Sequence, residues 1–139
     1  MAGAISLRVI TPENILVDTP ADSVRFPGLD GSIGVRPRHA PMVAALDAGS
    51  LSWAGPDGPG EMFVAGGFAE VRNNTLRIVT QAGELVGDID VERAEASAKR
   101  ARERLRVTGT AAKAGELDSL RAQAALRRAL QRMRMAQTR

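Results

Sequence analysis

Short runs of apolar residues alternating with polar ones dominate the first part of the chain, to about residue 86. The runs are rich in branched and aromatic side chains, and clusters of glycine, proline, asparagine and aspartate separate them. Such runs are typical of β-strands, because successive side chains of a strand point to opposite faces. Several strands without helical periodicity between them predict a small sandwich or barrel. The expected strands lie in SLRVI (6–10), SVRF (23–26), EMFV (61–64), FAEVR (68–72) and TLRIV (75–79).

Two of these runs are joined by only Asn73 and Asn74. Asparagine adopts a positive φ more readily than most other residues, and a two-residue hairpin turn requires it. The sequence therefore predicts a tight antiparallel hairpin at this point.

The pattern changes to a helical period after about Gly87. Apolar residues recur at steps of three and four over about 88–105, which places them on one face of a helix. Asp88 or Asp90 is expected to cap this helix and to suit its positive end. After the connector VTGTAAKAG (107–115), a second helix is expected from about Glu116. A short connector between two such helices predicts an antiparallel hairpin. The apolar stripes are Val91, Ala94, Ala98, Ala101 and Leu105, then Ala122, Leu126, Ala129, Leu130 and Met133.

The two expected helices also resemble each other in sequence. Residues 89–105 laid over residues 117–133 give seven identities in seventeen positions. The shared arginines lie seven and then four residues apart in each helix, so they occupy one face. These ridges are either a solvated surface or an anion site, in which guanidinium groups of two facing helices converge on a polyphosphate. The arginines are Arg93, Arg100 and Arg104, then Arg121, Arg128 and Arg132.

Charge divides the 139-residue chain near the same place. Residues 1–98 hold 7 Arg and 13 acidic residues, a balance of −6, whereas residues 99–139 hold 12 basic and 3 acidic residues, a balance of +9. Two regions with different roles are therefore expected. An apolar fraction of 44% is ordinary for a globular protein, and the absence of cysteine excludes disulfides and thiolate chemistry. Neither a signal peptide nor a membrane-spanning stretch is expected.

The sequence offers little for catalysis. It has no GxxxxGK[ST] phosphate loop and no pair of histidines for a metal site. GPDGPG and AGGF lack the context of a dinucleotide fingerprint. The single histidine, His39, lies among prolines and glycines, where a structural or interface role is commoner than that of a base. We therefore expect no catalytic residue, no metal and no required cofactor.

Three segments of the chain carry a resemblance to a known family. They are FPGLDGSIGVRPRHAPMVAALDAGSL (26–51), FVAGGFAEV (63–71) and IDVERAEA (89–96), in that order. Together they resemble the epsilon subunits of rotary, proton-translocating F-type ATP synthases. It implies a flattened β-sandwich of about ten strands over residues 1–86 and a regulatory, antiparallel two-helix hairpin over residues 87–139. It also implies a non-catalytic subunit that rotates with the central stalk.

The resemblance further implies partners for the sandwich: the gamma subunit and the ring of c subunits. Two departures from the family pattern bear on these contacts. Ser32 occupies a position that is often Glu, and Arg36 and Arg38 occupy positions that are usually apolar and glycine. The two extra cations either pair with acidic groups on gamma or face water. The residues expected to contact partners are Asp30, Gly31, Ser32, Arg36, Arg38 and His39.

For the hairpin, the resemblance implies two states. Some bacterial members bind ATP as a regulatory ligand between the folded helices, through a motif matched here by Ile89, Asp90, Arg93 and Ala94. In the extended state the second helix reaches the alpha and beta catalytic subunits and opposes ATP hydrolysis. The further expected ATP contacts are Glu84, Arg100, Arg128 and Arg132.

One alternative remains open on the residues alone. A small β-domain with a basic helical tail could bind nucleic acid. The tail, however, has no aromatic residue for base stacking, and the first region is acidic. The rotary interpretation instead expects no nucleic acid, contact with the membrane only through the complex, and a place on the cytoplasmic face of a bacterial plasma membrane.

Overall fold

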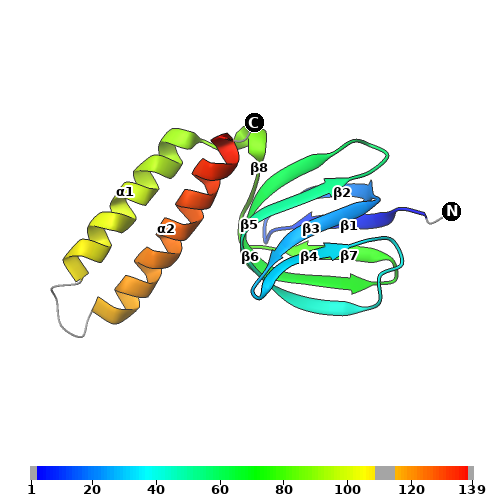
Figure 1. The fold of residues 1–139 in the computed structure, drawn as a ribbon, viewed down its shortest axis with the longest axis horizontal. Coiled ribbons are helices and arrows are strands. Elements are labelled where there is room, and N and C mark those ends of the chain that lie inside the picture. Colours follow the sequence, from blue (N-terminus) through cyan, green and yellow to red (C-terminus); the bar gives the residue numbers. More distant parts are fainter. Residues whose placement is uncertain (1–2, 109–114, 138–139) are drawn as a thin grey trace. The chain divides into compact units, whose positions relative to one another are not determined.

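The computed structural model of the chain describes residues 3–108 and 115–137. The chain forms two compact units, Met1–Val86 and Gly87–Arg139. The first unit is built of β-strands and the second of two long helices, which run side by side in opposite directions (Figure 1). The predicted fold class, a β-sandwich followed by a helical hairpin, is confirmed.

The described part of the first unit contains eight strands, ordered β2-β1-β7-β6-β5-β3-β4, with β8 pairing with β6. Neighbouring strands are antiparallel except β1 and β7, which are parallel. The strands are β1 (Ile5–Ile10), β2 (Ile15–Ala21), β3 (Ser23–Gly28), β4 (Gly31–Val35), β5 (Met42–Ala54), β6 (Gly60–Arg72), β7 (Thr75–Val79) and β8 (Gly83–Leu85).

The expected count of about ten strands differs from the eight described because β5 and β6 are continuous over 13 residues each. In β5 the buried positions change from even to odd numbers between Leu46 and Gly49, and in β6 the same change falls between Val64 and Ala69. Since side chains alternate strictly along a regular strand, this change marks a break in the pleat. Each long strand thus has two segments with opposite alternation.

In the other core strands, every second side chain is apolar and points into the sandwich. The core contains fully buried side chains from β1, β3, β5, β6 and β7, and in all of these strands except β5 the sequence periodicity predicted them. Burial of this apolar surface is the main stabilising term for a domain of this size. The largest of these core residues are Phe26, Ile5, Leu7, Leu51, Met62, Leu76 and Ile78.

The predicted hairpin turn between β6 and β7 is confirmed. Asn73 and Asn74 have φ values of 51° and 55°, and Arg72 pairs with Thr75 across the turn. Positive φ at both central residues is the geometry of a type I′ turn, whose twist suits the flanking strands.

The second unit contains α1 (Val91–Thr108) and α2 (Gly115–Gln137), preceded by the short 3-10 helix η1 (Val86–Asp88). Small side chains form the contact between the helices, which lets their backbones approach closely. Leu130 is the most exposed member of the expected stripes, at 38%, since it lies about 100° around the helix from Ala129. The larger stripe residues Val91, Leu105, Leu126 and Met133 are half-buried. The expected connector, 107–115, is shorter than predicted at both ends, because α1 extends to Thr108 and α2 begins at Gly115; residues 109–114 lie outside the described residues. The buried members of the two stripes are Ala94, Ala98, Ala101, Ala122 and Ala129.

Neither of the described helices is long and apolar enough to cross a lipid bilayer.

Candidate functional site

The residues predicted to contact partners fall in two places on the sandwich. Asp30, Gly31 and Ser32 lie at the turn between β3 and β4, where Gly28 pairs with Gly31. All three are exposed, and Gly31 has a φ of 131°, a conformation that favours glycine. The structure thus places the acidic tip of the loop in solvent, on a tight and regular turn.

Ser32 does not stand alone at this tip. Arg25 of β3 donates a hydrogen bond from Nη1 to Ser32 Oγ over 3.3 Å. The position that departs from the family pattern therefore has a cation beside it. A serine hydroxyl leaves the charge of that cation unneutralised, whereas a carboxylate would neutralise it.

Arg36, Arg38 and His39 lie beyond the other end of β4. The backbone N–H of His39 donates to the carbonyl oxygen of Arg36 over 3.2 Å, closing a turn. His39 Nδ1 lies 2.8 Å from the carbonyl oxygen of Ala40, and because a carbonyl can only accept, Nδ1 donates. The ring is thereby fixed by the backbone, which supports a structural role for His39.

The two places lie at the two ends of β4, and Ser32 and Arg36 are four residues apart, or roughly 13 Å at the rise of an extended strand. The six predicted contact residues are therefore not one patch but two, at opposite ends of an edge strand. A single small ligand cannot reach both ends, whereas a protein surface can. The arrangement suits attachment to one or more large partners.

Asn74 positions the loop that carries Arg36, Arg38 and His39. The sequence predicted Asn74 only as a turn residue and gave no sign of this contact. Its Oδ1 accepts a hydrogen bond from the backbone N–H of Arg38 over 2.8 Å, and its Nδ2 donates to the carbonyl oxygen of Ala4 over 3.1 Å. Arg38 itself has a φ of 65°, which is unusual for a residue with a long side chain. The hairpin turn thus clamps a loop 36 residues away in sequence.

The first residues of the predicted ATP motif have a structural explanation in the hairpin unit. Asp90 Oδ1 accepts a hydrogen bond from the backbone N–H of Arg93 over 3.1 Å, so Asp90, and not Asp88, is the N-cap of α1. Ile89 and Ala94 are buried, with exposed fractions of 4% and 3%. Capping and burial therefore account for three of the four motif positions, and Arg93 remains exposed.

The other predicted ATP contacts are distributed over both units. Glu84 lies in β8 of the first unit, and the arginines lie on the hairpin. Arg93 and Arg100 are exposed, whereas Arg128 and Arg132 are half-buried. Because the helices are antiparallel, Arg93 near the start of α1 lies at the same end of the hairpin as Arg128 and Arg132 near the end of α2.

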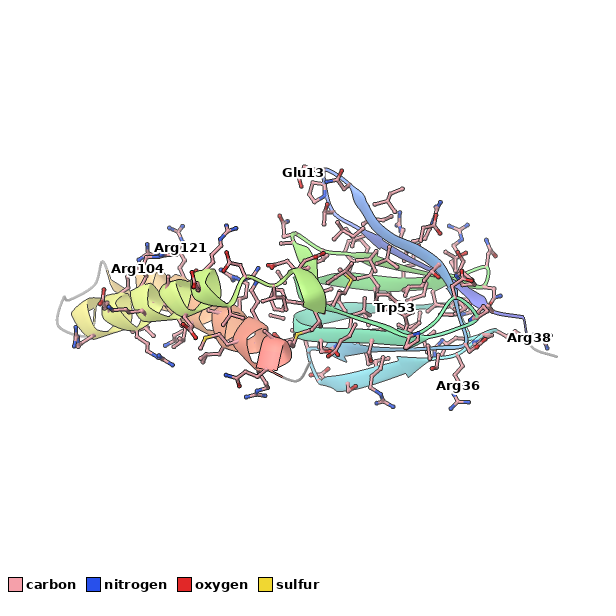
Figure 2. All side chains as sticks on the ribbon, turned by 90° about the horizontal axis from the view of Figure 1, so that it is seen from above. Glu13, Arg36, Arg38, Trp53, Arg104 and Arg121 are labelled. Atoms are coloured by element: carbon pink, nitrogen blue, oxygen red, sulfur yellow. The ribbon has the colours of Figure 1, made fainter. Side chains whose placement is uncertain are left out.

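The remaining two repeat arginines lie towards the opposite end of the hairpin. Arg104 belongs to the last turns of α1 and Arg121 to the first turns of α2, and Figure 2 labels both along one edge of the helix pair. Arg100 lies between the two ends and donates from Nη2 to Ser97 Oγ over 3.1 Å. The two ridges predicted from the repeat thus place guanidinium groups along the whole hairpin.

Two family models match the chain in succession. The β-sandwich domain of the ATP synthase delta/epsilon chain matches residues 4–86, and the long α-helix domain of the same chain matches residues 88–137. The junction of the two matches coincides with the division between the compact units.

Curated relatives agree with these models. The chain is 41% identical over 105 residues to the ATP synthase epsilon chain of Carboxydothermus hydrogenoformans, an alignment that covers 76% of this chain and 78% of the relative. It is 45% identical over 103 residues to the ATP synthase epsilon chain of Symbiobacterium thermophilum, covering 73% and 74% of the two chains.

Among solved structures, a chain of the Euglena gracilis mitochondrial ATP synthase, in an assembly of OSCP, F1 and c-ring, has a TM-score of 0.77. The match covers 100% of this chain and 83% of that chain at 20% identity. A chain of the central stalk and c-ring of the Tetrahymena thermophila enzyme has a TM-score of 0.54 at 14% identity, with 96% and 93% coverage. These two likenesses show the shared fold.

Proposed function

The chain belongs to the ATP synthase delta/epsilon chain family, and from that membership we propose that it is a non-catalytic, central-stalk component of an F-type ATP synthase. The observation that carries the proposal is the successive match of both family domains to its two units. This membership favours the rotary interpretation over a nucleic-acid-binding module.

The sandwich attaches the chain to the rotor by contacting the gamma subunit and the c ring. The argument for this attachment is the pair of turns at the ends of β4, one carrying Asp30 and the other carrying Arg36 and His39. Turns that hold a fixed shape before binding lose little conformational entropy when a partner engages them. The chain is then peripheral to the membrane, on the cytoplasmic face in a bacterium, and reaches it through the complex.

The hairpin regulates ATP hydrolysis by changing between a folded and an extended state. Support comes from its chemistry: most of its fully buried residues are alanines, and the ridges are made of arginines. An alanine contact buries little area per residue, so the folded hairpin is weakly held. Like charges on both helices weaken it further, and a polyanion that binds both ridges would strengthen it.

ATP is the proposed regulatory ligand of the folded state, and Arg93, Arg128 and Arg132 are the central contacts. ATP that binds only the folded hairpin favours that state by its differential affinity and no more. High ATP then keeps the helices folded, and low ATP permits their extension toward the catalytic subunits.

Replacing Arg128 by Ala tests the ATP site. We expect weaker binding of ATP to the full-length chain by about tenfold, since one charge-assisted hydrogen bond is lost. Titration calorimetry at low salt measures the affinity. Arg134→Ala is the matched control, because Arg134 is an exposed arginine of α2 outside the repeat set and its loss should leave the affinity unchanged. An Arg128→Ala chain that binds ATP like the parent removes that residue from the site.

Truncation after Val86, the boundary between the units, tests the regulatory role. The soluble catalytic complex is assembled with either the full chain or residues 1–86, and its ATP hydrolysis rate is measured. Faster hydrolysis with the truncated chain is expected if the hairpin opposes hydrolysis. Equal rates with both chains bound would deny the hairpin that role, and failure of the full chain to bind would contradict the central-stalk assignment.

A further inference from the structure

A shallow groove of about 530 Å3 lies over the ends of β3, β4 and β5, beside the turn that holds His39. None of its residues belongs to the hairpin unit, so it is a feature of the sandwich alone. The lining residues are Ser23, Val24, Arg25, Gly34, Val35, Arg36, His39, Ser52, Trp53 and Ala54.

The groove exists because the outward positions of these strands carry small side chains. Arg25 pairs with Ser52 on one side and with Gly34 on the other, and Ser23 pairs with Ala54. The intervening residues Val24 and Val35 point the other way and are buried in the core, with exposed fractions of 2% and 1%. Two serines, a glycine and an alanine therefore form a low floor on the outer face.

Arginine side chains stand beside this floor. Arg25 and Arg36 are exposed, and Figure 2 shows Arg36 pointing away from the sandwich. Neither guanidinium forms an ion pair with a carboxylate of the described residues. Arg25 contacts only a neutral hydroxyl, that of Ser32. The groove thus offers two guanidinium groups whose charge is not neutralised within the unit.

Among the residues that the structure describes, no carboxylate lines the groove. Glu61 of β6 pairs opposite Ser52, but its Oε1 accepts a hydrogen bond from Ser50 Oγ over 2.8 Å and is not among the lining groups. The lining charge is therefore positive, on a unit whose residues are in excess acidic. A positive groove on such a unit discriminates in favour of an acidic partner.

We propose that this groove docks an extended, carboxylate-bearing segment of a partner chain, with Arg25 and Arg36 as its anchors. The groove is shallow and open to solvent, whereas sites for small molecules enclose most of their ligand. Planar guanidinium groups bind carboxylates in a bidentate manner, and the serine hydroxyls of the floor can hydrogen-bond the segment. The inference rests on the proposed function in one respect: in the cell, the partner is another chain of the same complex.

Trp53 provides a nearby reporter, because it is the only tryptophan of the chain and lies between the floor residues Ser52 and Ala54, with its side chain packed against the core. The full-length chain is titrated with a hexaglutamate peptide at low salt, and tryptophan emission is recorded. We expect a saturable change that high salt abolishes, since exposed ion pairs are screened. Hexalysine should give no change. The absence of a saturable change with hexaglutamate overturns the proposal.

Charge reversal locates the binding. The double variant Arg25→Glu, Arg36→Glu should weaken hexaglutamate binding at least tenfold, and the milder Arg25→Gln, Arg36→Gln should weaken it less. The double variant Arg8→Glu, Arg72→Glu is the matched control, because it reverses the same number of charges at exposed arginines of the same sandwich outside the groove. Circular dichroism checks that each variant is folded. Equal weakening by this control would show an effect of net charge and would overturn the proposal.

Ser32→Glu gives a graded test without removing a cation. Its carboxylate would lie beside the Arg25 guanidinium, which is 3.3 Å from Ser32 Oγ, and would compete with the segment. Binding should fall severalfold.

Inorganic phosphate as a competitor separates a site for small anions from one for an acidic segment: displacement of hexaglutamate by millimolar phosphate at constant ionic strength would overturn the proposal.

Assembly with the catalytic complex separates this inference from the proposed function. If the parent chain binds the complex and Arg25→Glu, Arg36→Glu binds at least tenfold more weakly, the acidic segment belongs to a chain of that complex. If both bind equally, the groove is not a contact within the complex and this inference fails while the proposed function stands. If the parent chain itself does not bind, the proposed function fails, whatever the peptide titration shows.

Discussion

The side-chain oxygen of Asn74 accepts a hydrogen bond from the backbone N–H of Arg38 over 2.8 Å, and this contact joins the β6–β7 turn to the loop after β4. The same amide group donates to the carbonyl oxygen of Ala4. One side chain thus ties together three segments that are far apart in sequence. The conformation of the loop that carries Arg36 and His39 is therefore stabilised by Asn74, which lies outside that loop.

Replacing Asn74 by Gly should destabilise the sandwich by about 1–2 kcal/mol, because two hydrogen bonds are lost and glycine retains the positive φ. Urea unfolding followed by tryptophan fluorescence measures the change. Asn73→Gly is the control: Asn73 has a similar φ, and its side chain makes no hydrogen bond with the described residues. A similar loss in both variants would show that the turn itself, and not the clamp, is at issue.

Gly67 and Gly66 in β6 should respond very differently to alanine. Both have positive φ, 117° and 96°, but a Cβ at Gly67 would overlap the carbonyl oxygen of Val79, whereas a Cβ at Gly66 finds no atom closer than 3.6 Å. Gly66→Ala should cost about 1–2 kcal/mol from backbone strain, and Gly67→Ala more than about 3 kcal/mol. Equal stabilities of the two variants in urea would rule out the steric argument.

Asp90 should act on α1 through its capping oxygen. Asp90→Ala should lower helix stability by about 1 kcal/mol, and Asp90→Asn should be nearly neutral, because asparagine caps as well as aspartate. Helix content is followed by circular dichroism at 222 nm during thermal unfolding. Asp88→Ala is the control, since Asp88 lies in η1 before the cap. An equal loss for Asn and Ala would point to the negative charge instead of the cap.

Ala98 lies in the contact between α1 and α2 with an exposed fraction of 1%. Ala98→Leu should overpack this contact and destabilise the hairpin by about 1–3 kcal/mol. Ala96→Leu, on the exposed side of the same helix, should change stability by less than about 0.5 kcal/mol, because leucine is also a good helix former. If Ala98→Leu is tolerated as well as Ala96→Leu in urea, the alanine contact is looser than the burial indicates.

Local features of the fold could be predicted because their causes lie in neighbouring residues. The turn at Asn73 and Asn74 follows from a backbone preference, and α1 follows from its apolar period and its capping aspartate. The alanine contact of the hairpin follows from the same period. Membership of the family could be predicted because its motifs extend along the chain in order.

Features set by strand register could not be predicted. The change of alternation within β5 and β6 depends on which residues of other strands they face, and single runs such as EMFV and FAEVR showed only its two halves. Similarly, none of the expected strands lay between residues 27 and 60, whereas pairing with β3 makes residues 31–35 a strand whose two ends carry the two contact places. Arg25 was overlooked because only this pairing brings it to Ser32.

The parallel pairing of β1 with β7 has a consequence for the order of folding during synthesis. Ser6 pairs with Thr75 and Ile10 with Val79, so β1, the first strand of the unit, can complete its pairing only after β7 has been synthesised. Contacts so distant in sequence form late, since a long loop must close first. The hairpin needs only neighbouring segments. On the ribosome, one edge of β1 therefore stays unpaired until β7 has emerged. During synthesis this edge can pair with other chains, so β1 is the strand most exposed to aggregation.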